Sequence, residues 1–289
     1  MPYILVLISA FTHAYWNFIL KRAKGGQVFI GLSKAAEIVL FFVPFIYFIT
    51  KDEIAILNYW VFYVVGSLLV IFNYFFLGQA YKRGDLSLVY PTSRAGALLF
   101  LPGLAYLFIG ERVDVVGFIA FCLIIIGLFA IQLTSFSSDE IQSVISKFKN
   151  SATILALLAA FTAACYTLWD KHSISYLPPF VYFYAYTAIV GISYAIFILV
   201  KYPSLSIKTE WERSKYSILQ VGFFNTFTYL LVLYSLQTGK ASYVIALRQL
   251  SIAFGVFLGW KVLRETFPFP KRVGVAVLLA GCLLISQAR

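Results

Sequence analysis

Ten long apolar segments, separated by short polar loops, run through this chain and decide what it can fold into. A helix of about 20 apolar residues is long enough to cross a bilayer. In lipid, a helix satisfies its own backbone hydrogen bonds, which favours a helical bundle. Charged residues make up 12% of the sequence, against roughly 25% in a soluble domain. The sequence therefore predicts an all-α membrane protein with ten transmembrane helices.

The apolar segments divide into two groups of five at one long polar interval. Residues 135–150 (SFSSDEIQSVISKFKN) are predicted to form an amphipathic linker between a first five-helix unit, 1–134, and a second, 151–289. The predicted spans are 3–20, 29–50, 60–81, 86–109, 113–134, 152–170, 179–200, 216–237, 241–263 and 270–287.

The two units repeat each other. ILVLISAFTHAYWNFILK (4–21) aligns without gaps with ILALLAAFTAACYTLWDK (154–171), and eight of the eighteen positions are identical. Glu111 and Glu265 correspond at an offset of 154 residues. Because five is an odd number, the second unit enters the membrane in the opposite direction. Inverted repeats of this kind build secondary transporters, with a central substrate site between them.

One arginine lies inside the fourth span of each unit. Arg94 and Arg248 are also 154 residues apart, and each lies about 12 Å along its helix. From opposite faces, these depths converge near the middle of a roughly 30 Å hydrocarbon core. A buried guanidinium costs at least ~2.5–3.5 kcal/mol, and it binds phosphate or carboxylate with two hydrogen bonds. A bound anion is therefore the favoured interpretation, and a structural role with carbonyl oxygens at helix ends is the alternative.

Polar and aromatic side chains accompany the arginines. His13, Trp16 and Asn17 share one face of the first span. His13 and Glu37 are the candidates for proton coupling, since histidine titrates near neutral pH. The alternatives are a packing role for His13 and an internal ion pair between Glu37 and Lys34. The other candidate substrate-binding residues are Tyr90, Tyr166, Tyr243 and Gln249.

Several classes of function lack support in the sequence. The net charge of +11 lies mostly in short loops, where it suits anionic lipid headgroups better than nucleic acid. The three cysteines are widely spaced within apolar spans, so neither a disulfide framework nor a metal site is expected. None of the predicted spans contains paired carboxylates, and the sequence has no phosphate-binding glycine loop. We expect neither enzymatic activity nor a cofactor.

Orientation follows from the lysines and arginines in the loops. Loops after the odd-numbered spans hold fifteen of the 23 basic residues, and loops on the opposite side hold five. Because basic loops stay in the cytoplasm, both termini are predicted to be non-cytoplasmic. We expect a multi-pass protein of the cell membrane whose partners are the lipid bilayer and a small-molecule substrate, acting as a monomer.

The duplicated pattern resembles the EamA-type branch of the drug/metabolite transporter superfamily. The resemblance lies in HAYWN and LKR of the first span and in GERV (110–113) and RETF (264–267) before the fifth and tenth. It implies ten helices around a central cavity, alternating access, and substrates that range from amino acids to sugar phosphates and drugs.

The leading prediction is a secondary transporter of a small organic anion or zwitterion, such as a phosphate ester, phosphonate or amino acid. Arg94 and Arg248 would hold the negative group near the membrane midplane. The alternatives are an exporter of aromatic or cationic metabolites or drugs, and a flippase of a lipid-linked anion.

Overall fold

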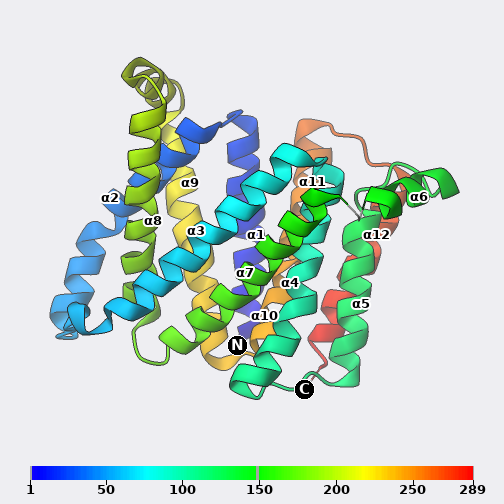
Figure 1. Ribbon diagram of the computed structural model, residues 1–289, viewed down its shortest axis with the longest axis horizontal. Helices are drawn as coiled ribbons and strands as arrows, with labels where there is room; N and C mark the ends of the chain where they lie inside the picture. Colours follow the sequence, from blue (N-terminus) through cyan, green and yellow to red (C-terminus); the bar gives the residue numbers. More distant parts are fainter. Residues whose placement is uncertain (1, 148–149, 289) are drawn as a thin grey trace.

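The computed structural model describes residues 2–147 and 150–288, and these form helices and connecting loops without a β-strand. Figure 1 shows the helices side by side, most of them running in alternating directions. The elements are α1 (Pro2–Arg22), α2 (Gln27–Lys51), the 3-10 turn η1 (Ile56–Tyr59), α3 (Trp60–Arg83), α4 (Leu86–Ile109), α5 (Val115–Ala130), α6 (Ser138–Lys147), α7 (Ser151–Ser173), α8 (Pro179–Lys201), α9 (Ser204–Thr238), α10 (Ala241–Arg248), α11 (Leu250–Leu263) and α12 (Phe269–Ile285).

Eight helical segments in the described part of the chain are long and apolar enough to cross a membrane. They are α1, α2, η1 with α3, α4, α7, α8, α9, and α10 with α11. The other two predicted spans coincide with shorter helices: α5 has 16 residues and α12 has 17. The prediction of an all-helical membrane protein is thus confirmed, whereas length and composition support eight spans.

The helix α9 begins earlier than predicted. Its 35 residues start at Ser204, twelve residues before the predicted start of that span. At about 1.5 Å per residue it is roughly 52 Å long, which exceeds a hydrocarbon core of about 30 Å. The extra turns are polar, and Arg213 Nη2 pairs with Glu210 Oε2 at 2.6 Å. This end of α9 therefore extends beyond the apolar layer.

The predicted ninth span is divided at Gln249. The eight-residue helix α10 ends at Arg248, and α11 begins at Leu250. Gln249 is buried, and its side-chain Nε2 donates to the Ile245 carbonyl at 3.1 Å. The side chain thus hydrogen-bonds a carbonyl in the last turn of α10. Interrupted membrane helices are tolerated where such groups are satisfied inside the protein.

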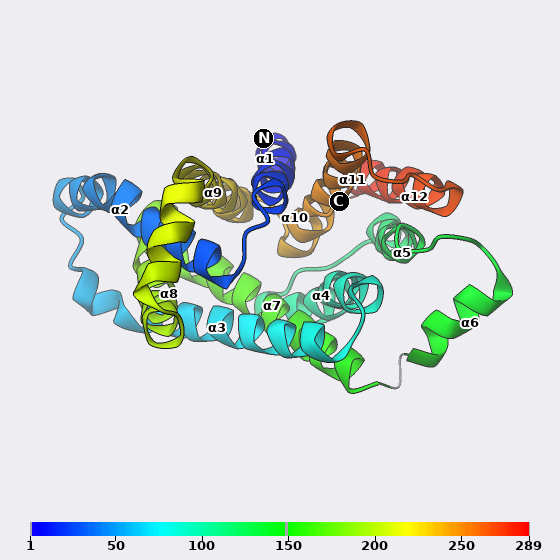
Figure 2. The ribbon, with the colours of Figure 1, turned by 90° about the horizontal axis from the view of Figure 1, so that it is seen from above.

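Helices from the first half of the chain pack against helices from the second half. The pairs α5 with α12, α3 with α7, and α1 with α9 lie side by side in both ribbon views (Figures 1 and 2). Glycines permit the closest of these contacts. A Cβ atom built on Gly127 would lie 2.7 Å from the Gly274 carbonyl oxygen, and one on Gly281 would lie 2.9 Å from the Ala120 carbonyl oxygen.

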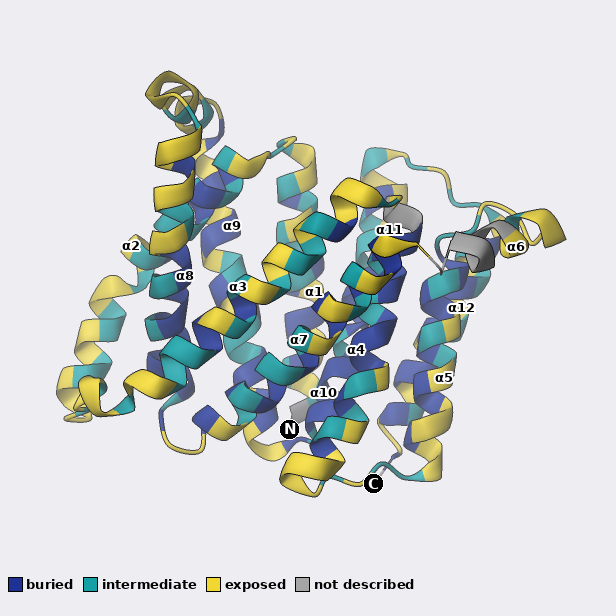
Figure 3. Ribbon diagram, in the orientation of Figure 1, coloured by how far each residue is buried: buried dark blue, intermediate teal, exposed yellow. Residues whose placement is uncertain are grey.

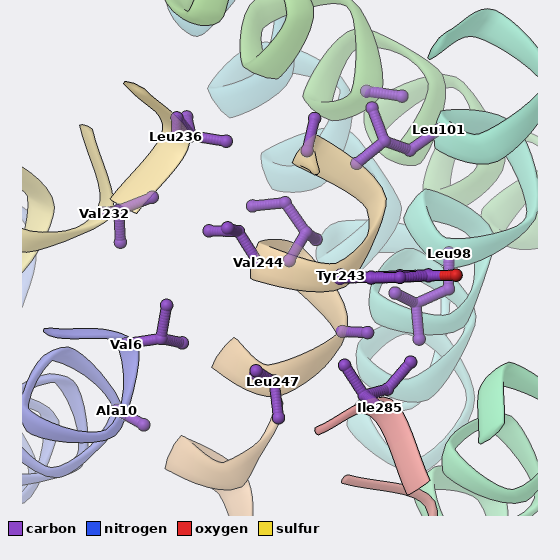
Figure 4. Packing of buried hydrophobic residues seen from close by; sticks show 14 of the residues in the cluster. Val6, Ala10, Leu98, Leu101, Val232, Leu236, Tyr243, Val244, Leu247 and Ile285 are labelled. Atoms are coloured by element: carbon purple, nitrogen blue, oxygen red, sulfur yellow. The ribbon is translucent and has the colours of Figure 1, made fainter. Parts of the chain in front are cut away.

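The bundle is buried along its centre and apolar on its outside. Figure 3 shows buried residues on the inner helix faces and exposed residues on the outer ones. The helix α10 lies within the core, where Val244 and Leu247 point toward side chains of α1 and α9 (Figure 4). Large apolar residues such as Val43 and Val200 are 73% and 84% exposed. In a bilayer, these outward side chains would contact lipid.

Candidate functional site

A cavity of about 300 Å³ lies among the helices of the bundle. Residues of both halves of the chain line it: those of the first half come from α1 to α4, and those of the second from α7 to α10 and from Gln249. The charged and strongly polar lining residues are His13, Lys34, Asn73, Arg94, Asn225, Arg248 and Gln249. A pocket of this size between bundle helices accommodates a small molecule.

Both predicted arginines line this one cavity, although 154 residues separate them in the sequence. The guanidinium carbon of Arg94 lies 5.5 Å from the centre of the Tyr90 ring. That of Arg248 lies 5.1 Å from the centre of the Tyr229 ring. Among the ion pairs of the described residues, none involves either arginine. The aromatic rings stabilise the two guanidinium groups by cation–π attraction but do not neutralise them. The cavity therefore retains positive charge.

Two buried N–H groups in the cavity wall lack acceptors. Trp16 Nε1 and Arg248 Nε have no hydrogen-bond partner within the described residues. A buried donor without an acceptor costs about 1–3 kcal/mol, so such groups point to a missing ligand or solvent molecule. Both donors belong to cavity-lining residues. The cavity thus offers positive charge and free donors, which together suit an anionic oxygen.

The third lining cation is already neutralised. Lys34 Nζ lies 2.9 Å from Glu37 Oε1, and Asn225 Nδ2 donates to the same oxygen at 2.8 Å. Glu37 itself is buried behind Lys34 and Asn225. The sequence alternative of an internal ion pair between Lys34 and Glu37 therefore describes the structure.

Asp170 lies fully buried near the C-terminal end of α7. Its Oδ1 accepts from Tyr182 Oη at 2.6 Å, and its Oδ2 accepts from Tyr229 Oη. Tyr229 also lines the cavity and carries Arg248 over its ring. One side chain therefore separates this carboxyl group from the cavity.

Most predicted binding residues lie at the cavity. The structure brings together six of them: His13, Trp16, Arg94, Tyr166, Arg248 and Gln249. The edge-to-face rings of His13 and Trp16 are 5.1 Å apart. Whether these residues bind substrate stays a prediction, because their placement shows proximity alone.

Three predicted binding residues lie outside the cavity lining. Asn17 is exposed, and its Nδ2 donates to the His13 carbonyl at 2.7 Å. Tyr90 lies beside Arg94 without reaching the lining. Tyr243 is buried against α5, where its hydroxyl hydrogen-bonds with Asp114. Helical spacing alone could not place Tyr243, because a buried tyrosine can face either the cavity or a neighbouring helix.

Other polar lining residues were not among the predicted binding residues. They are Asn73, Tyr74, Ser93, Thr167, Tyr186, Thr187, Asn225 and Tyr229. Polar residues on apolar spans are a usable signal, but they also join helices. With 20 tyrosines in the chain, no sequence feature separates Tyr186 and Tyr229 from the tyrosines that pack elsewhere.

Two ion pairs connect the first and second halves of the chain. Lys171 pairs with Glu111, and both Glu111 oxygens accept from the Ala241 backbone N–H at 2.9 Å. Lys21 pairs with Glu265. The Lys171 and Glu111 side chains are 25% and 10% exposed, whereas those of Lys21 and Glu265 are 63% and 34% exposed. The first contact is thus the more enclosed one.

Within residues 2–147 and 150–288, no cluster of three or more histidine, cysteine or acidic side chains could hold a metal ion. The three cysteines, Cys122, Cys165 and Cys282, are free thiols.

Fold and site together define a multi-pass helical membrane protein with a charged internal cavity. Residues 150–287 match the EamA-like transporter family. The uncharacterized protein MJ1333.1 of Methanocaldococcus jannaschii is 31% identical over 137 residues, which are 47% of this chain and 97% of that protein. The chain belongs to the EamA-like transporter family and is thus a membrane transporter of the drug/metabolite type. Proteins of this family are generally not enzymes.

A solved crystal structure of a protein shows a similar arrangement of helices over nearly all of the chain. The match covers 99% of this chain and 97% of that one, with a TM-score of 0.74 and 11% sequence identity. At this identity the likeness concerns the arrangement of helices alone.

Proposed function

We propose that this protein is a secondary transporter of a small organic anion or zwitterion, such as a phosphate ester, a phosphonate or an amino acid. The observation that carries the proposal is the cavity shared by Arg94 and Arg248, neither of which has a carboxylate partner among the described residues. An anion bound by both arginines would supply the missing countercharge. His13, Trp16, Tyr166 and Gln249 would surround it.

The transport cycle that we propose uses two inverted five-helix repeats, 1–134 and 151–289, joined by the linker 135–150. Recurring contacts support the repeats. The Gly31 position meets Ile198, and the Gly191 position meets Ile38, which is the same contact after a shift of 160 residues. The pair of Lys171 with Glu111 likewise recurs as the pair of Lys21 with Glu265, at repeat offsets of 150 residues for the lysines and 154 for the glutamates. In this arrangement α5 and α12 also cross the bilayer, which makes ten spans.

Repeats of this kind give alternating access when one moves relative to the other around a fixed site. We place the protein in the cell membrane with both termini outside the cytoplasm, because the basic loops after the odd-numbered spans favour the cytoplasmic side. The bilayer and the small-molecule substrate are then its partners, and a single chain holds the complete cavity.

A stability assay tests the anion site. The purified protein would be heated with phosphate esters, phosphonates, amino acids and organic cations. A ligand that binds only the folded state stabilises it by about 2.7 kcal/mol at one hundred times its Kd. We expect an anion to raise the Tm of the wild type, and Arg94→Gln or Arg248→Gln to abolish this rise.

The matched control is Arg272→Gln, which removes the same charge from an exposed position in α12. It should keep the anion-dependent rise in Tm. Stabilisation by organic cations or neutral aromatics alone would contradict the anion site and favour an exporter of such compounds. Stabilisation by lipid-linked anions alone would favour a flippase.

A further inference from the structure

Asp170 is a buried carboxyl group with an unusual set of neighbours. It is 0% exposed, and the side chains that hydrogen-bond to it are the phenols of Tyr182 and Tyr229. No ion pair of the described residues includes Asp170. Burial strongly disfavours a carboxylate that lacks a partner of opposite charge. Ionisable groups inside membrane spans are functional candidates by default.

Tyr229 connects Asp170 with the cavity. Its hydroxyl donates to Asp170 Oδ2, and its side chain lines the cavity. The second phenol, Tyr182, packs against Gly66 of α3. A Cβ atom built on Gly66 would lie 2.6 Å from the Tyr182 hydroxyl oxygen. Tyr182 is fully buried and does not line the cavity. Of the two phenols that hydrogen-bond Asp170, Tyr229 is therefore the one that also lines the cavity.

The charged and titratable groups around Asp170 come from four helices. Phenols face it from α7, α8 and α9, and a guanidinium faces it from α10; these are Tyr166, Tyr182, Tyr186, Tyr229 and Arg248. From α3, Gly66 lies against the Tyr182 hydroxyl. Phenols are uncharged at neutral pH, so Arg248 is the charged member of this set. The charge of Asp170 is thus electrostatically coupled to one of the two cavity arginines.

The charge of the cavity region depends on whether Asp170 carries a proton. Among the described residues, Glu37 and Asp170 are the buried carboxyl groups, and Glu37 already pairs with Lys34. With Asp170 ionised, the two arginines retain one uncompensated positive charge. With Asp170 protonated, they retain two. A bound anion should therefore be more stable beside the protonated form.

We propose that Asp170 is the proton-binding site of this transporter, loaded from the cavity through Tyr229, and that anion and proton bind cooperatively. The proton on Tyr229 Oη moves to Asp170 Oδ2, and Tyr229 regains a proton from solvent in the cavity. The net change is one proton taken up and one carboxylate neutralised. The coupling rests on the proposed anion site. By linkage, the anion favours the proton as strongly as the proton favours the anion.

Proton uptake during anion binding tests this coupling in the full-length protein. Sulfate is the probe, because it carries no group that titrates near neutral pH. An indicator dye in weakly buffered micelles would report protons taken up as sulfate binds. We expect up to one proton per sulfate, and a Kd that falls by up to about tenfold for each unit decrease in pH. Asp170→Asn should bind sulfate without proton uptake and without this pH dependence.

Two other carboxyl or imidazole groups could hold the proton instead. Glu37→Gln and His13→Gln distinguish them, since His13 lines the cavity and Glu37 pairs with the lining residue Lys34. If proton uptake persists in Asp170→Asn and disappears in either of these variants, Asp170 is not the proton-binding site.

Two tyrosine variants test whether the proton reaches Asp170 through Tyr229. This test does not require that Asp170→Asn folds. Tyr229→Phe and Tyr182→Phe each remove one hydrogen bond to Asp170, and the substitution at Tyr229 keeps an aromatic ring beneath Arg248. Proton uptake after a pH jump, followed by stopped flow, should be slower in Tyr229→Phe than in Tyr182→Phe. Equal rates in the two variants would contradict entry through Tyr229.

The failure of the anion site can be separated from the failure of the proton site. If sulfate does not bind the wild type, the proposed anion function fails for this probe class. Infrared difference spectra without an anion then decide the assignment of Asp170. A carboxyl C=O band that titrates in the wild type and is absent from Asp170→Asn supports the proton site, and an unchanged band in that variant overturns it.

Discussion

At the contact between α5 and α12, glycines let the backbones of the two helices approach closely. A Cβ atom on Gly274 would lie 2.5 Å from the Ile131 backbone nitrogen. Backbone cannot rotate away as a flexible side chain can, so any larger residue must push the helices apart. Close approach through small residues is a common means of helix association in lipid.

We therefore expect Gly274→Ala to destabilise the protein by about 1–3 kcal/mol. Gly255→Ala is the matched control, because a Cβ at this position in α11 meets no atom within 4 Å. In a helix interior, this change should be neutral or stabilising by roughly 0.5–1 kcal/mol. Thermal unfolding in micelles measures both. Equal effects of the two substitutions would show that the α5–α12 contact is not tightly packed.

Single residues differed in how well the sequence indicated their place. Arg94 and Arg248 could be assigned to a common cavity because charge within an apolar span is costly and the repeat offset links the two positions. Tyr243 could not be assigned in this way. Its hydroxyl hydrogen-bonds Asp114 in the preceding loop of α5, and this long-range partner leaves no trace in helical spacing.

Among the helices, the linker α6 shows how one side chain can fold back over the preceding loop. Glu140, in the first turn of α6, accepts from the Ser135 hydroxyl at 2.6 Å and from the Thr134 backbone N–H at 2.8 Å. These hydrogen bonds favour the carboxylate and lower the pKa of Glu140 from 4.5 to about 2. The ionised side chain thereby holds the loop between α5 and α6 in place.

The lowered pKa gives this loop a defined pH dependence. Its contribution is present above about pH 4.5 and disappears as the pH falls through about 2. We expect Glu140→Gln to speed amide hydrogen exchange at Thr134 and Ser135 near neutral pH. Wild type and variant, compared by mass spectrometry, should converge as the pH approaches 2. A difference that stays constant down to pH 2 would contradict this role for the carboxylate.

The boundaries of most helices could be predicted, since hydrophobic runs determine them. Two features could not. The polar start of α9 at Ser204 has no apolar signal, and the interruption at Gln249 lies within a segment that is long enough to be predicted as one span, 241–263. A glutamine that satisfies a carbonyl in the preceding turn, as Gln249 does for Ile245, has the same sequence appearance as one that lines a cavity.

For the whole molecule, the two ion pairs between the halves of the chain are chemically alike but differ in exposure. Glu111 also accepts the Ala241 N–H at the start of α10, so it joins three segments. Ion pairs that are open to solvent contribute about 0–1 kcal/mol, whereas hydrogen bonds to enclosed charges contribute about 1.5–3 kcal/mol each.

Glu111→Gln should therefore lower the free energy of unfolding by about 1.5–3 kcal/mol, and Glu265→Gln by at most about 1 kcal/mol. The two substitutions remove the same charge from corresponding positions, so each serves as the control for the other. Equilibrium unfolding in mixed micelles measures the difference. An equal loss in both variants would show that the two contacts are equally enclosed. The sequence repeat identifies Glu111 and Glu265 as corresponding positions, but it does not indicate which of the two ion pairs is the enclosed one.

The pairing of Lys34 with Glu37 has a consequence for the orientation of a substrate in the cavity. After a shift of 160 residues, the one that relates Gly31 to Gly191, the corresponding residues of the second half are Tyr194 and Phe197, which carry no charge at neutral pH. A pore built from two identical halves would present the same groups twice and could not tell one end of a molecule from the other. Here the charged pair occurs on one side only. A substrate with two different ends should therefore bind in one preferred direction.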